Sequence, residues 1–147
     1  MLPRWPVHRV VLDTSVVAAA FRSRNGASRV LLDRVADRLL VALATPALFL
    51  EYEAVLKRSE QRVVSGLTLA QVDERLAALA SALEPVTTHF VWRPQLADAD
   101  DEMVLDAAVN GRADALVTFN VRDFALAARR FGLAVVRPGE VLEALKP

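Results

Sequence analysis

The sequence lacks cysteine, and this absence excludes a disulfide scaffold, a thiolate zinc site and a thiol nucleophile. It also lacks a long apolar segment. Its longest stretch without a charged residue, residues 39–50, contains Pro46 and is shorter than the roughly 20 residues that span a bilayer. No apolar signal region follows residues 1–6. These absences together predict a cytoplasmic protein that is not inserted in a membrane.

The chain carries no net charge, because 18 basic residues balance 18 acidic ones. Nucleic-acid binders usually show a basic excess, so any basic surface on this protein must be local. Arginine, the side chain best suited to phosphate, accounts for 16 of the 18 basic residues. The length of 147 residues and the 54% of hydrophobic residues predict one globular domain over residues 1–147, with a sizeable core.

Short apolar runs that suit strands alternate with segments of helical periodicity. Such alternation builds right-handed βαβ units, so we expect an α/β fold, a three-layer sandwich with a central parallel sheet of four to five strands. The expected strands are residues 8–12, 39–44, 115–118 and 133–136, with a weaker candidate at 86–90. The expected helices are residues 29–38, 46–58, 69–83, 98–110, 121–130 and 139–145.

Polar residues lie at or near the ends of two of the expected strands. Asp13 ends the first strand, Asn120 follows the strand at 115–118, and Asp123 falls in the first turn of the next helix. In a parallel sheet the working crevice lies outside the carboxyl ends of the strands, which makes these residues candidates for a site. A structural interpretation is also open, in which Asp13 caps the following helix and Asn120 is a turn residue.

Four more carboxylates fall within residues 98–102. Asp98 can serve as an N-cap, and Asp100 and Glu102 can simply stabilise the positive end of the helix. Asp101 is different, because it lies on the apolar stripe of that helix, with Val104, Leu105 and Ala108. Its carboxylate should therefore point inward, where a charge needs a partner.

Glu51 and Glu53 lie at the two borders of the apolar stripe of the helix that begins at Pro46, and helical geometry alone does not choose between them. Several carboxylates converging on one crevice without matching lysines would repel one another. Oxygen-only clusters of this kind are typical of sites for Mg²⁺ or Mn²⁺, which commonly serve phosphoryl chemistry. The pattern predicts such a divalent-metal site.

Four motifs, at residues 11–16, 45–56, 98–108 and 117–124, resemble in order and spacing those of the PIN-domain nucleases, most of all the toxin components of bacterial toxin–antitoxin pairs. The resemblance covers nearly the whole chain. It selects Glu51 over Glu53 and implies that Asp13, Glu51 and Asp101 are the catalytic and metal-binding acids. Metal ligation would extend to Asp98, Asn120 and Asp123.

The family resemblance implies an endonuclease for single-stranded RNA that needs Mg²⁺ or Mn²⁺. Members of the family are commonly homodimers, and the resemblance implies the same here. It also implies a cognate antitoxin protein that holds the enzyme inactive. Asn120 departs from the pattern, since the family often has Asp after its Val-Thr pair. That departure leaves open whether one or two metal ions bind.

The same residues bear on two other enzyme classes. A haloacid-dehalogenase-type phosphatase would need a second Asp where Ser15 stands, and dinucleotide binding would need a glycine-rich turn where Gly26 stands alone. A catalytically degenerate module that binds RNA or protein remains the main alternative, and Asn120 is the residue that favours it. The basic residues that could track RNA phosphates, or be merely solvated, are Arg22, Arg24, Arg29 and Arg122.

Overall fold

A computed structural model describes residues 8–91 and 93–145, so residues 1–6, on which the expectation about a signal region rests, lie outside the described part. The described residues form five parallel strands in the order β3-β2-β1-β4-β5. The strands are β1 (Arg9–Leu12), β2 (Val41–Ala44), β3 (Glu84–Pro85), β4 (Ala115–Val117) and β5 (Ala134–Val136).

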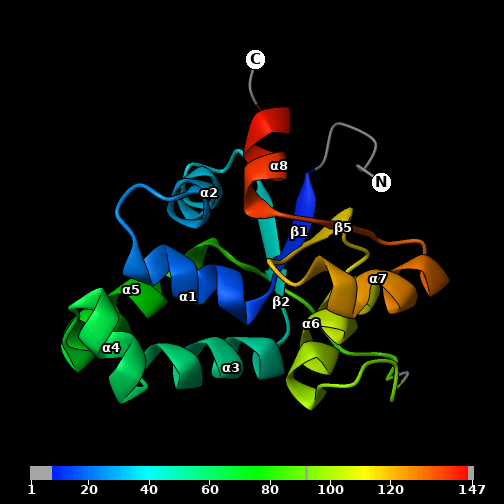
Figure 1. Cartoon of the computed structure of the whole chain (residues 1–147), viewed down its shortest axis with the longest axis horizontal. Coiled ribbons are helices and arrows are strands. Elements are labelled where there is room, and N and C mark those ends of the chain that lie inside the picture. Colours follow the sequence, from blue (N-terminus) through cyan, green and yellow to red (C-terminus); the bar gives the residue numbers. More distant parts are fainter. Residues whose placement is uncertain (1–7, 92, 146–147) are drawn as a thin grey trace.

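The helices of the described residues fill the connections between the strands (Figure 1). They are α1 (Thr14–Arg22), α2 (Ala27–Ala36), α3 (Pro46–Leu56), α4 (Ser59–Ser65), α5 (Leu69–Ala82), α6 (Ala99–Asn110), α7 (Val121–Arg130) and α8 (Pro138–Ala144). Within the described ranges, no helix has the length and apolar character needed to cross a membrane.

The strand order places helices on both faces of the sheet. The chain steps from β1 to β2 to β3 in one direction and from β4 to β5 in the other. Because parallel crossovers are right-handed, the reversal puts α6 and α7 on the face opposite α1 to α5. Figure 1 shows α6 and α7 across the sheet from α1 and α2, and α6 packs against β1, β2 and β4. The expected three-layer α/β arrangement is confirmed.

The core is built from the central strands and the inward faces of the helices that cover them. Val10, Val11 and Leu116 have no exposed surface, as expected for β-branched and leucine side chains of a sheet covered on both faces. Tyr52 of α3 and Phe124 of α7 are also fully buried, one on each side of the sheet. The ends of β1 and β4 are therefore held by packing from both layers.

Local sequence signals place most helix starts. Thr45 caps α3 by accepting the N–H of Leu48 at 3.1 Å, with Pro46 as the first helical residue. Thr68 and Gln71 form the capping box that starts α5. The predicted helix at residues 121–130 is α7, with identical bounds.

The weaker strand candidate at residues 86–90 is wrong. The fifth strand is β3, just before it, and the ladder ends where the N–H of Val86 bonds to the carbonyl of Ala44. Beyond that point the side chain of Asn110 takes the N–H groups of His89 and Phe90, at 2.8 and 2.9 Å. A side chain of α6 thus replaces the neighbouring strand as hydrogen-bond partner.

Helix α2 differs from expectation in its bounds, and α1 and α4 are absent from the predicted helix ranges. The predicted helix at 29–38 is α2, which begins two residues earlier, because Gly26 starts the helix by accepting the N–H of Val30. It ends before Arg38, whose positive φ of 64° cannot continue a right-handed helix. The short helix α4 had no sequence prediction.

Candidate functional site

The carboxyl ends of β1 and β4 lie side by side at the point where the strand order reverses. Leu12 pairs with Val117, and the N–H of Asp13 continues the ladder to the carbonyl of Val117 at 2.9 Å. In open parallel sheets, ligands bind in the crevice at such a switch point. The topology therefore brings Asp13 and the residues that follow β4 to the edge where a site is expected.

Asp13 is buried, with 5% of its surface exposed, and it occupies the N-cap position of α1 without making a side-chain cap bond. Asp13 is therefore the N-cap residue through its backbone, but its side chain does not cap α1. Its Oδ2 atom instead accepts hydrogen bonds from Ser15 Oγ at 2.9 Å and from Thr118 Oγ1 at 2.7 Å. Two hydroxyl groups hold this carboxylate in a fixed orientation.

Asn120 is linked to Asp13 through Thr118. The backbone N–H of Asn120 donates to Thr118 Oγ1 at 2.9 Å, and Thr118 is fully buried. The side chain of Asn120 makes no cap bond to α7 and lines the pocket in front of Asp13. Its amide is available to a ligand.

Helix α3 presents one of its two candidate glutamates to this pocket. Glu51 is half-buried and lines the pocket, whereas Glu53 pairs with Lys57 at 3.2 Å. The residue between them fixes this orientation, because the buried Tyr52 hydroxyl donates to the carbonyl of Leu12 at 2.5 Å. That bond ties α3 to the end of β1.

Helix α6 contributes acids from its first turn. Asp98 is the N-cap and accepts the N–H of Asp100 at 2.8 Å, as expected for a capping residue. Asp101 is half-buried on the inward face and lines the pocket. Asp100 lines it too, although sequence reasoning gave it only a role at the helix end. Because Asp100 is exposed and off the apolar stripe, the sequence carried no signal for this placement.

Glu102 lies in the first turn of α6, as expected, but it has a further role there. It is buried, with 3% of its surface exposed. Its Oε1 atom accepts the N–H groups of Gln95 and Leu96 at 2.6 and 2.8 Å, and its Oε2 atom has no partner among the described residues. Glu102 holds the chain that leads into α6 and does not line the pocket.

The pocket formed by these residues has a volume of about 210 Å³. Three elements supply its acids: the end of β1, α3 and the start of α6. Its lining consists of Asp13, Thr14, Ser15, Ala18, Glu51, Val55, Asp100, Asp101 and Asn120. Four of the six predicted site residues therefore meet here, while Asp98 and Asp123 are exposed and do not line the pocket.

The acids repel one another, as the sequence predicted. Burial, followed by the charges of Asp13, Asp98, Asp123 and Asp100, raises the pKa of Asp101 from 3.8 to about 6. Burial and the charge of Asp100 also raise the pKa of Glu51, and Arg58 opposes that effect. The site thus concentrates negative charge that a cation would neutralise.

The donor set suits a hard divalent cation, because its oxygen atoms come from carboxylates and one amide. Within residues 8–91 and 93–145, no three acidic or histidine side chains lie close enough together to enclose an ion by themselves. Mg²⁺ does not require this, since it usually keeps several waters and binds through one or two carboxylates plus substrate phosphate. The residues present therefore fit an open Mg²⁺ or Mn²⁺ site.

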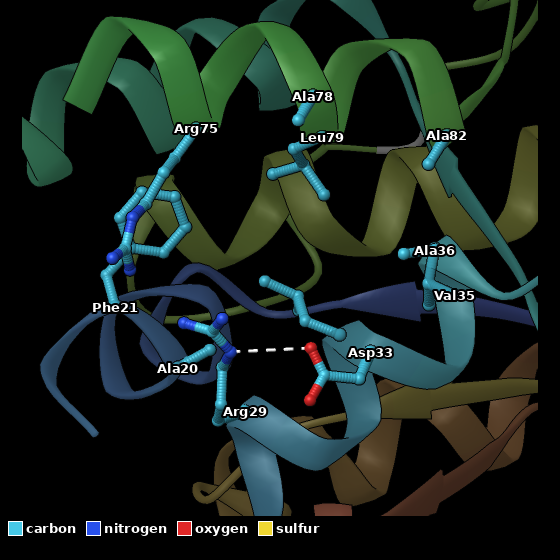
Figure 2. Close-up of a pocket in the computed structure, with 11 residues that line it drawn as sticks. Ala20, Phe21, Arg29, Asp33, Val35, Ala36, Arg75, Ala78, Leu79 and Ala82 are labelled. Atoms are coloured by element: carbon cyan, nitrogen blue, oxygen red, sulfur yellow. Dashed lines mark hydrogen bonds and ion pairs between the residues drawn. The ribbon is translucent and has the colours of Figure 1, made fainter. Parts of the chain in front are cut away.

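A second pocket, of about 230 Å³, lies between α1, α2 and α5 and has a different character (Figure 2). Apolar side chains such as Phe21 and Leu79 form its walls. Its acid, Asp33, pairs with Arg29 at 3.4 Å. Since it offers no unpaired carboxylate, it is not a candidate for metal-dependent chemistry.

Comparison with known proteins agrees with this geometry. The PIN domain family matches residues 9–122. A chain in the crystal structure of VapBC2 from Rickettsia felis, bound to a DNA fragment from their promoter, is similar, with a TM-score of 0.60 and 15% sequence identity. The similarity covers 88% of this chain and 98% of that chain, and at this identity it shows the fold alone. No curated protein sequence matches. The family match, the fold and the acidic switch point together show that the chain belongs to the PIN domain family.

Proposed function

We propose that this protein is a divalent-metal-dependent endoribonuclease that cleaves single-stranded RNA and acts as the toxin of a toxin–antitoxin pair. The observation that carries the proposal is the meeting of Asp13, Glu51 and Asp101 in one pocket at the switch point of the sheet. Membership of the PIN domain family supports it, because PIN domains are typically nucleases. Because its proposed substrate is RNA, the protein would act in the cytoplasm.

In this proposal each pocket residue has a distinct role. Asp13 and Asp101 would hold Mg²⁺ or Mn²⁺, and the amide oxygen of Asn120 would orient a water ligand. When bound, such an ion would act as a Lewis acid toward the phosphodiester. Glu51, whose pKa is raised by burial, is suited to accept a proton from the attacking water. Thr118 and Ser15 keep the carboxylate of Asp13 oriented.

A matched pair of glutamates on one helix tests the proposal. With Mn²⁺ and a labelled single-stranded RNA, Glu51→Gln should lose cleavage at least 100-fold, on the order expected for a proton-transfer group. Glu53→Gln should keep cleavage, because Glu53 pairs with Lys57 outside the pocket. Equal loss in both variants, or cleavage that survives a chelator, would contradict the proposed chemistry.

The proposed restraint is a partner protein, because the similar solved structure is that of a complex, VapBC2. A partner could insert an Arg or Lys among the pocket carboxylates and supply the charge that a cation would otherwise supply. Expression of the chain alone should then arrest growth, and Asp13→Asn should relieve the arrest. Harmless expression of both forms would remove the support for a toxin.

Light scattering of the purified protein would test the proposed homodimer.

A catalytically degenerate RNA- or protein-binding module is the second candidate, and the neutral Asn120 in the pocket is the observation that favours it. Asn120→Asp adds a negative charge beside Asp13 and should tighten Mn²⁺ binding. If RNA cleavage appears only in this variant, the natural protein is a binding module and the nuclease proposal is wrong.

A further inference from the structure

The acidic pocket continues between two helices that begin at the same edge of the sheet. On α1, Thr14 and Ala18 line the pocket, and on α3, Glu51 and Val55 line it. The two helices pack against each other and lead from the region of α6 toward α4 (Figure 1). The faces that line the pocket therefore extend away from the acids.

Each of these two helix faces leads to an arginine. Arg22 is four residues beyond Ala18 on α1, and Arg58 is three residues beyond Val55, following Lys57, the C-cap residue of α3. Residues three or four apart share a helix face. With a rise of about 1.5 Å per residue, Arg58 begins about 10 Å beyond Glu51 along α3.

The charge of Arg58 is not held in a close ion pair. It is exposed, and its guanidinium makes no hydrogen bond or ion pair with any residue in the described ranges. It is the N-cap residue of α4 through its backbone, without a side-chain cap bond. Its charge reaches the pocket, because it opposes the rise in the pKa of Glu51. The helix start does not explain the presence of an arginine here.

Arg22 is held in place without being neutralised. Its Nη1 atom donates to Gln61 Oε1 at 3.0 Å, and Gln61 Nε2 donates to the carbonyl of Ala18 at 2.9 Å. Gln61 is buried in α4, so it fixes the guanidinium against the end of α1. Because the partner is a neutral amide, the full positive charge of Arg22 remains.

Two other arginines lack this placement. Arg29 pairs with Asp33 and lines the apolar pocket of Figure 2. Arg75 lines that same apolar pocket from α5. Arg22 and Arg58 are set apart because they extend the two helix faces that line the acidic pocket.

We propose that Arg22 and Arg58 form a phosphate track for single-stranded RNA. This track binds the backbone of the strand on the side of the acidic pocket away from α6. The inference rests on the proposed function for the identity of the strand. An RNA strand carries phosphates at regular intervals, so a strand with one phosphate at the acids would place further phosphates along the two helix faces that lead away from them. Two guanidiniums beyond the acids match this pattern of charge.

The salt dependence of RNA binding tests the track. We would measure the affinity of the full chain for a labelled single-stranded oligoribonucleotide by fluorescence anisotropy, with Ca²⁺ added and NaCl varied. For single strands, each phosphate contact contributes about −0.7 to the slope of log K against log salt. Arg22→Gln and Arg58→Gln should each reduce the slope by about 0.7, and the double variant by about 1.4.

Matched variants separate the track from folding effects. Arg22→Lys and Arg58→Lys should keep the slope, since they keep the charge. Arg75→Gln removes a charge from the other pocket and should leave the slope unchanged. In Mn²⁺ the two Gln variants should raise KM for RNA several-fold, and Arg22→Gln should leave kcat unchanged.

The outcomes distinguish this inference from the proposed nuclease. Reduced slopes without any cleavage would support the track and refute the nuclease. Cleavage with slopes unchanged in both Gln variants would refute the track alone, and so would absence of RNA binding. The track would also be refuted if the two Gln variants lost affinity for a poly-glutamate peptide as strongly as for RNA. The surface would then recognise an acidic protein segment.

Discussion

At the scale of single residues, the candidate site depends on a buried carboxylate that two hydroxyl groups orient. Thr118 connects the two neighbouring strand ends, because it donates to Asp13 and accepts from the backbone of Asn120. An oriented carboxylate can bind a cation without first losing side-chain freedom. Thr118 therefore acts on the site through Asp13 and not by touching a substrate.

Thr118→Val tests this role with almost no change in shape. It should destabilise the protein by about 1–3 kcal/mol, because Asp13 and the N–H of Asn120 each lose a buried hydrogen-bond partner. It should also weaken Mn²⁺ binding by about 10–100-fold. Denaturant unfolding and metal titration measure the two effects. Thr118→Ser keeps the hydroxyl and should restore metal binding, and equal metal affinity in Val and Ser variants would contradict the orienting role.

Asp101 gives the metal-free protein a dependence on pH. Its pKa in the folded state is about 6, against the ordinary aspartate value of 3.8, so the folded state binds the proton more tightly than the unfolded state. The ionised group therefore costs stability above about pH 6, and the cost disappears as pH falls to about 4. Because Asp101 is only half-buried, solvent screening reduces the cost to on the order of 1 kcal/mol.

Asp101→Asn should remove this cost. Without metal at pH 7 the variant should be more stable than the wild type by on the order of 1 kcal/mol, and the difference should vanish near pH 4. Chemical denaturation of both proteins across this pH range measures it. A variant that is no more stable than wild type at pH 7 would show that the acids do not repel in the folded state.

At the scale of elements, α6 positions its acids through a row of polar side chains on the face that meets the preceding chain segment. Asn110 bonds to the backbone of residues 89 and 90, Asp106 pairs with Arg93 at 2.7 Å, and Glu102 accepts from residues 95 and 96. Arg130 of α7 also bonds to Gln95. The segment leading to Asp98 is thus fixed along the helix, and the first turn of α6 with it.

Glu102→Ala tests this attachment of the preceding segment to α6. Loss of two short hydrogen bonds to a buried carboxylate should destabilise the protein by about 3 kcal/mol. The amides of Gln95 and Leu96 should exchange hydrogen faster, which NMR can follow. Glu74→Ala, at an exposed position on α5, is the matched control and should change little. Unchanged exchange at residues 95 and 96 would refute the role of Glu102.

Elements with strong local signals could be predicted from the sequence, and those defined by tertiary contacts could not. Thr45 with Pro46 and Thr68 with Gln71 place their helices through caps within four residues. The strand β3 pairs over only two residues, and a side chain of α6 decides where it ends. No local pattern contains that information.

The candidate site shows the same division. Asp13 was recognisable because a polar residue follows an apolar strand, and Asp101 because it interrupts an apolar stripe. The choice of Glu51 over Glu53 needed the family resemblance, since the bond from Tyr52 to Leu12 that orients α3 joins residues 40 positions apart. Asp100 reaches the pocket through tertiary placement alone.

At the scale of the whole molecule, metal binding should be linked to folding, because the acids converge only in the native state. Binding to the native state raises stability by about 2.7 kcal/mol at a hundredfold excess of metal over Kd. For a chain of this size, that corresponds to a rise in Tm of about 5–10 °C. Thermal unfolding with Mn²⁺ and with a chelator measures the shift. Asp13→Asn should lose most of it, and a full shift in that variant would place the metal elsewhere.

The most direct test of the central claim is cleavage of single-stranded RNA by wild-type protein and Asp13→Asn, purified in parallel and assayed in the same Mn²⁺ buffer. The switch-point pocket predicts metal-dependent cleavage by the wild type and none by the variant, with both proteins folded by circular dichroism. Cleavage of equal rate by both proteins would contradict the account, because the activity would then come from another site or from a contaminating enzyme.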